Sequence, residues 1–79
     1  KRIGRDRFVR NVLIAIGNSA DCTLAKHAKA LLSDTSPLVR GAAVWALTRL
    51  VGRDEFETLR DRHSEGETDA IVVEEWRAT

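Results

Sequence analysis

The feature that most constrains the fold is an apolar pattern that occurs twice, 31 residues apart. Four apolar positions of the first copy fall on apolar positions of the second when they are moved forward by 31: Phe8, Val12, Ala15 and Ile16 fall on Val39, Ala43, Ala46 and Leu47. In each copy, these residues recur at the three- and four-residue spacing of one helix face and are the expected core positions. A repeat of about 30 residues built from helices predicts a helical solenoid, in which each unit buries its apolar face against the next.

Helix breakers and capping residues divide the chain into expected helices. The first is predicted over about residues 5–16 and should end at Gly17 and Asn18, which both tolerate the left-handed conformation of a helix C-cap. Ser19 should cap a second helix that ends near Ser33.

The third helix has the clearest start signal. Ser36 is its expected N-cap and Pro37 its first residue, where the missing N–H of proline costs nothing. Its expected core face consists of apolar residues that lie within roughly 100° of one another around the helix: Val39, Ala43, Ala46, Leu47 and Leu50. Gly52 should end this helix.

Two shorter helices should complete the chain. Asp54, with Glu57 three residues later, resembles a capping box, and Thr68 or Asp69 should cap the last helix. The side chains expected to point inward from these two helices are Phe56, Leu59, Ile71, Val72 and Trp76. For residues 1–79 we therefore predict a single all-α domain of about five helices, a short repeat solenoid of two and a half units.

The charges are distributed unevenly, although the formal net charge is only +1. Up to Gly52 there are nine basic and three acidic residues, a net charge of +6, and from Arg53 onward there are four basic and nine acidic residues, a net charge of −5. Because charges are screened over about 8 to 10 Å, a polyanion at the basic end would feel little of the acidic end. The other interpretation is that both ends are simply solvated.

Composition excludes several classes of protein. No apolar run approaches the roughly 20 residues of a membrane-spanning helix, so we expect no membrane contact. The single cysteine, Cys22, cannot form an internal disulfide or supply the thiolates of a zinc or iron–sulfur site, which favours a cytoplasmic protein. The chain begins at Lys1 without a methionine or signal segment, and we interpret it as a piece of a longer protein.

Two stretches resemble known families. From Ser36, the segment SPLVRGAAVWALTRL resembles a HEAT-like repeat of the bilin-lyase type, with its Val-Arg pair and Ala-x-x-Ala-Leu helix. The ordered combination of RIGRDRFVRNVLIAIGN from Arg2, that segment, and EEW from Glu74 resembles the C-terminal region of bacterial epoxyqueuosine reductases.

The resemblance implies a role in tRNA modification. Enzymes of that family reduce epoxyqueuosine to queuosine in tRNA with a cobalamin and two [4Fe–4S] clusters. The residues that bind these cofactors would lie upstream of Lys1, and Cys22 matches none of them. The resemblance implies that this repeat domain helps to hold tRNA, with tRNA and the upstream catalytic domain as its partners and with no cofactor of its own. We expect the fragment to be a monomer.

The candidate tRNA contacts are basic residues, because guanidinium groups bind phosphate bidentately and RNA binding releases counterions. They are Lys1, Arg2, Arg5, Arg7, Arg10 and Arg40. The first five could instead pack against an upstream domain or be solvated. For Arg40, an ion pair with Asp34 across the turn is the favoured alternative.

Three other residue types have competing interpretations. Trp45 could stack on an RNA base, but its equivalent 31 residues earlier is Ile14, which favours packing between repeats. His27 and His63 lack a second ligand at a metal spacing and are expected at the surface, and Cys22 is expected to be buried or inert.

No nucleophile motif or phosphate-binding glycine loop is present, so the fragment by itself has no predicted catalytic residues. Two alternatives to tRNA binding remain open. One is a HEAT-like protein-interaction scaffold that does not bind nucleic acid, and the other is a repeat domain of a lyase that acts on bilins.

Overall fold

The computed structural model describes residues 2–78, so Lys1, one of the predicted tRNA contacts, lies outside the described residues. The described part contains five α-helices and no strand: α1 (Arg2–Asn18), α2 (Ala25–Ala30), α3 (Pro37–Leu50), α4 (Arg53–His63) and α5 (Ala70–Arg77). Short 3₁₀ turns occupy Cys22–Leu24, Leu31–Ser33 and Ser64–Gly66. The all-α prediction is confirmed.

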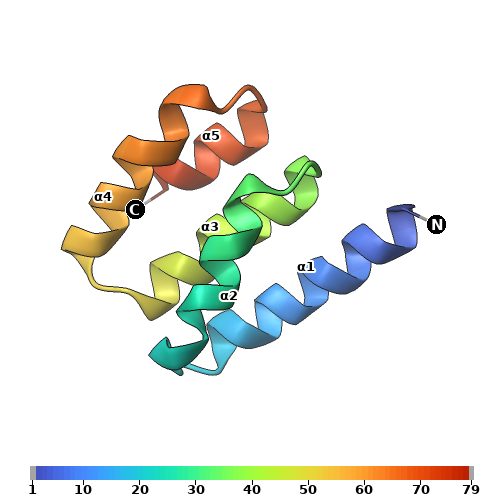
Figure 1. Ribbon diagram of the computed structural model, residues 1–79, viewed down its shortest axis with the longest axis horizontal. Helices are drawn as coiled ribbons and strands as arrows, with labels where there is room; N and C mark the ends of the chain where they lie inside the picture. The colour runs from blue at the N-terminus through green and yellow to red at the C-terminus, as the bar shows by residue number, and fades with distance from the viewer. Residues whose placement is uncertain (1, 79) are drawn as a thin grey trace.

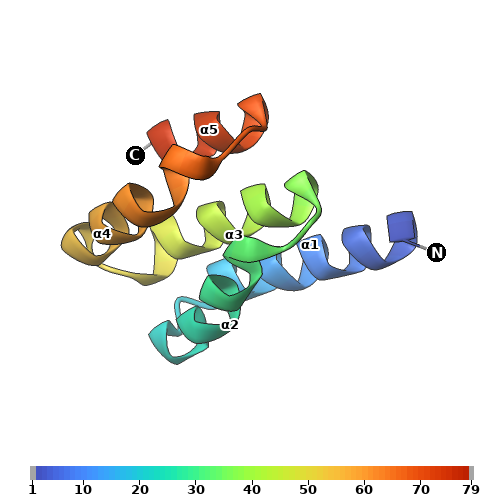
Figure 2. The ribbon, with the colours of Figure 1, turned by 45° about the horizontal axis from the view of Figure 1, so that its top comes forward.

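Helix α3 lies at the centre of the structure. Helices α1, α3 and α5 lie side by side and run in the same direction, while α2 and α4 lead the chain back (Figures 1 and 2). Because both α1 and α5 pack against α3, the core forms around it. The fully buried side chains include Leu13, Leu47, Val44 and Trp76.

Helix α3 begins and packs as its sequence predicts. The Ser36 hydroxyl accepts a hydrogen bond from the Val39 N–H at 3.4 Å, and Pro37 occupies the first turn. The expected core face of this helix is buried along its length, from Val39 to Leu50. These local signals therefore place the start of the central helix and its rotation about its axis, and the helix ends at Leu50, two residues before Gly52.

The prediction for α1 is wrong in one respect. Phe8 is 68% exposed, and Val12 and Ala15 are exposed as well, although their counterparts in α3 are buried. Instead, α1 buries Leu13 and packs Val9 against the core. The reason is that α3 has a helix on each side, whereas no described helix covers the side of α1 that carries Phe8.

Helix α1 ends at Asn18, within two residues of the predicted end, but the predicted left-handed cap is wrong. Gly17 and Asn18 remain helical, and the left-handed residue is Ala20, with φ of 56°. Gly17 serves close packing instead: a Cβ at this position would lie 2.5 Å from Cζ3 of Trp45 and 3.2 Å from Cα of Ala46. The next helical turn is capped by Asp21, whose carboxylate accepts the Thr23 N–H, and not by Ser19.

Helices α4 and α5 correct two further expectations. Gly52 is the N-cap of α4, so Asp54 lies inside the first turn and makes no capping box. In α5, Asp69 is the N-cap as predicted, and Val72 and Trp76 are buried. Ile71, however, is not part of the core and is 74% exposed.

Candidate nucleic-acid interface

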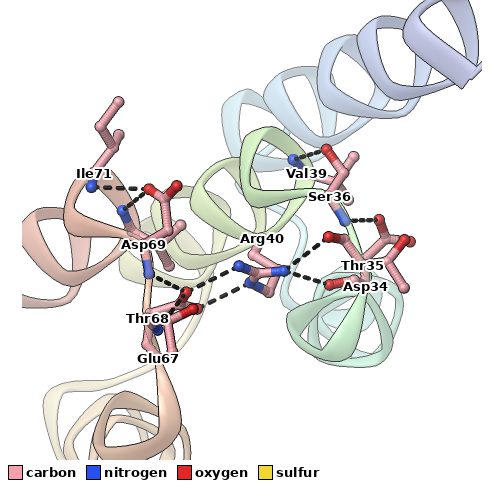
Figure 3. A network of polar contacts seen from close by, with 10 residues as sticks. Asp34, Thr35, Ser36, Val39, Arg40, Glu67, Thr68, Asp69 and Ile71 are labelled. Atoms are coloured by element: carbon pink, nitrogen blue, oxygen red, sulfur yellow. Dashed lines mark hydrogen bonds and ion pairs between the residues drawn. The ribbon is translucent and has the colours of Figure 1, made fainter.

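Arg40 is held in a network that joins two turns of the chain (Figure 3). Its Nε and Nη2 donate to the two carboxylate oxygens of Glu67, both at 2.9 Å, and its Nη1 donates to the carbonyls of Asp34 at 2.9 Å and Thr35 at 3.1 Å. The side chains of Arg40 and Glu67 are only 17% and 7% exposed. Arg40 therefore connects the turn before α3 to the turn before α5 and has few N–H groups left for a ligand.

Glu67 also orders the start of α5. Its Oε2 accepts the backbone N–H groups of Thr68 at 3.1 Å and Asp69 at 2.9 Å, and Asp69 in turn accepts those of Ile71 and Val72. The hydrogen bonds from Arg40 hold the pKa of Glu67 below its usual range. Sequence reasoning missed Glu67 because it lies 27 residues from Arg40.

The carboxylate of Asp34 pairs with Arg5 and not with Arg40. Arg5 donates to both Asp34 oxygens, at 3.0 and 2.7 Å, and also to Asp6 at 2.8 Å. The hydrogen bonds from Arg5 are the main reason that the pKa of Asp34 falls to about 2. Arg5 thus ties α1 to the turn before α3, with two carboxylates beside its charge.

The predicted arginines of α1 do not share one surface. Because each residue advances a helix by about 100°, Arg7 lies roughly 200° further around the axis than Arg5, close to the opposite side of the helix. Arg2 lies 3.9 Å from the Asp6 carboxylate on an exposed part of the helix. Arg7 is exposed and makes no ion pair within residues 2–78, and the one side-chain hydrogen bond of Arg10 goes to Asn11 at 3.0 Å. Among the predicted contacts that the structure describes, Arg7 and Arg10 have no acidic partner within residues 2–78.

An apolar groove of about 380 Å³ lies beside this part of α1. Its lining residues come from α1, α3 and α5: Arg10, Ile14, Asn18, Pro37, Leu38, Gly41, Ala42, Trp45, Ile71 and Glu75. Leu38, Ala42 and Trp45 lie on one face of α3 at helical spacing, and the tertiary structure brings Ile14 and Ile71 beside them.

Trp45 is partly buried between α3 and α1. The edge of its ring meets the backbone at Gly17, and the Arg49 guanidinium lies 5.3 Å from the ring centre. The Arg49 Nε also donates to the Gly17 carbonyl at 3.3 Å. The indole thus packs between the two helices that carry the repeated pattern, and its remaining surface faces the groove.

The cysteine and the two histidines lie at separate places in the structure and do not form a common site. Cys22 and His27 are exposed, whereas His63 is partly buried and stacks on Trp76 with ring centres 6.3 Å apart. Within residues 2–78, no three His, Cys, Asp or Glu side chains cluster as metal ligands would. In the same range, no helix has the length and apolarity to cross a membrane.

Comparison with protein-family models, curated proteins and solved structures finds no match to this chain.

Proposed function

We propose that this chain is a HEAT-like tRNA-binding domain of an enzyme of the epoxyqueuosine reductase kind, and that α1 supplies its phosphate contacts. The observation that carries the proposal is that Arg7 and Arg10 lie on the side of α1 away from Arg5 and have no acidic partner within residues 2–78. Arginines with free N–H groups gain most from a phosphate, because no intramolecular ion pair has to break.

The proposal divides the predicted basic residues into two groups. Arg7 and Arg10 contact phosphate, and Arg2 joins them because its Nε is 3.9 Å from the Asp6 carboxylate, too far for a hydrogen bond, and its side chain is 61% exposed. Arg5 and Arg40 support the fold through Asp34 and Glu67.

The repeat assignment and the parent enzyme are part of the same proposal. The parallel arrangement of α1, α3 and α5, with α2 and α4 as return helices, is the arrangement that stacked helix pairs produce. In such a stack, the exposed Phe8 face of α1 would pack against a preceding unit, which suits a domain that follows a catalytic region. The cobalamin and the iron–sulfur clusters would belong to that region, and this domain would position the tRNA for it.

The experiment measures the affinity of the protein for tRNA by fluorescence anisotropy at several salt concentrations. We expect Arg7→Gln and Arg10→Gln together to weaken binding and to reduce the slope of log K against log salt by about one for each lost phosphate contact. Arg77→Gln removes the same charge from the exposed end of α5 and is the matched control.

The proposal fails if the double variant keeps the affinity and the salt slope of the original protein. It also fails if the Arg77→Gln control loses as much affinity as each α1 variant, because binding would then depend on net charge and not on α1.

A further inference from the structure

The groove between α1, α3 and α5 has the form of a channel with an apolar floor. Leu38, Ala42 and Trp45 of α3 form its floor at the spacing of one helix face, and Ile71 of α5 stands at its rim. Leu38 and Ile71 are both large exposed apolar side chains. Clusters of exposed apolar side chains around a depression mark binding surfaces more often than chance exposure does.

The dimensions of the channel suit the side chains of a helix. From Arg10 to Asn18, its α1 wall extends about 12 Å, since each helical residue rises 1.5 Å. This length corresponds to about two turns, over which an amphipathic helix presents three apolar side chains at i, i+3 or i+4, and i+7. Ala42 leaves room for those side chains in the middle of the floor, whereas Gly41 lies beneath α5, where a Cβ would be 3.8 Å from Cγ of Glu75.

The two walls of the channel carry opposite charges. Arg10 lines the α1 wall and Glu75 the α5 wall, and the Glu75 carboxylate makes no hydrogen bond or ion pair within residues 2–78. Within residues 2–78, the Nε of Arg10 is buried and lacks a hydrogen-bond partner, so an external acceptor could reach this N–H only if the side chain moved.

These charges distinguish between occupants. A nucleic acid in the channel would place phosphates near Glu75, and a uniformly basic helix would meet Arg10, so each would face repulsion at one wall. A ligand surface that carries an acidic side chain on one flank and a basic one on the other would place an opposite charge beside both Arg10 and Glu75.

We propose that this groove docks an amphipathic helix of a partner protein. The apolar stripe of that helix lies on Leu38 and Trp45, an acidic side chain faces Arg10, and a basic side chain faces Glu75. The site is separate from the tRNA surface except for Arg10, and it does not depend on the proposed RNA function. Its test therefore uses Leu38, Ile71 and Glu75, none of which the tRNA proposal needs.

The probes are three labelled peptides of about 16 residues, roughly four helical turns, that share one leucine stripe. The first carries Glu on one flank and Lys on the other, the second carries Glu on both flanks, and the third carries Lys on both. Because a helix can lie in either direction, the mixed peptide satisfies both walls, and we expect it to bind most tightly in fluorescence polarisation.

Three variants test the location of the site. We expect Leu38→Asp and Ile71→Asp each to weaken binding of the mixed peptide by about tenfold or more, since each places a carboxylate in the apolar contact. Phe8→Asp is the matched control, because Phe8 is similarly exposed but lies outside the groove, and it should leave the affinity unchanged. Glu75→Lys makes both walls basic and should move the preference to the peptide with Glu on both flanks.

The proposal is overturned if the mixed peptide does not bind at about 1 mM, or if Phe8→Asp weakens it as much as Ile71→Asp does. It is also overturned if sedimentation shows that the protein dimerises and that Ile71→Asp dissociates the dimer, because a second copy then fills the groove. A single-stranded RNA whose affinity falls with Ile71→Asp would make the groove a nucleic-acid site. Loss of tRNA binding in Arg7→Gln alone would leave the helix proposal untouched.

Discussion

Gly17→Ala tests how closely α1 and α3 pack. Both residues are compatible with a helix, and alanine is the better helix former by about 1 kcal/mol. The added methyl group would nevertheless lie 2.5 Å from Cζ3 of Trp45 and 3.2 Å from Cα of Ala46. Ordinary carbon contacts are about 3.5 to 4.0 Å, so the helices must separate or the indole must move.

The expected free-energy change follows from these opposing terms. Overpacking a filled interface costs about 1 to 3 kcal/mol, and the contact with Ala46 involves backbone, which cannot move aside like a flexible side chain. The gain in helix propensity offsets part of this cost. We expect Gly17→Ala to lower the free energy of unfolding by about 1.5 kcal/mol, or Tm by roughly 6 to 12 °C in a domain of this size.

The assay is thermal and urea unfolding followed by circular dichroism at 222 nm, with Gly4→Ala as the matched control. A Cβ at Gly4 meets nothing within 4 Å, so the same substitution in the same helix should be neutral or stabilise by up to about 1 kcal/mol. Trp45→Phe should reduce the cost of Gly17→Ala, because the smaller ring leaves space. The reasoning is refuted if Gly17→Ala is as stable as Gly4→Ala.

Three further predictions concern the polar contacts that order the turns. Arg40→Gln leaves the Glu67 carboxylate without its bidentate partner and should lower the free energy of unfolding in urea by about 1 to 3 kcal/mol. Because Arg5 lowers the pKa of Asp34 to about 2, their contribution to stability is present above pH 4 or so and is lost as the pH falls toward about 2. Arg5→Gln should therefore flatten the pH dependence of the urea midpoint in that window, and an unchanged profile would contradict the assignment. Asp69→Ala removes the cap that accepts two N–H groups of α5 and should cost about 1 kcal/mol, with loss of helical circular dichroism as the readout.

The elements whose signals are local were predictable. Ser36, Pro37 and Asp69 act through hydrogen bonds within three residues or through the fixed φ of proline, so their effect is readable from spacing alone. The core face of α3 was predictable for a different reason, because helical periodicity sets which residues share a face.

Predictions that needed knowledge of neighbours were less successful. The repeat pattern assigned Phe8 to the core, but burial requires an adjacent helix, and α1 has a described one on one side only. The carboxylates that pair with Arg5 and Arg40 lie 29 and 27 residues away, and many acidic residues were equally possible partners in the sequence. The sequence alone could not show which arginines of the predicted basic cluster form ion pairs, as Arg5 does, and which do not, as is the case for Arg7 and Arg10 within residues 2–78.

Helix formation, the caps at Ser36 and Asp69, and the all-α class follow from short-range chemistry that is complete within a few residues, and the amino-acid sequence was sufficient for them. The tertiary structure alone decided which apolar faces are covered, where Gly17 lets two helices meet, and how Arg10, Trp45, Ile71 and Glu75 come to line one groove. These features depend on the mutual placement of α1, α3 and α5, and periodicity within one helix carries no information about that placement.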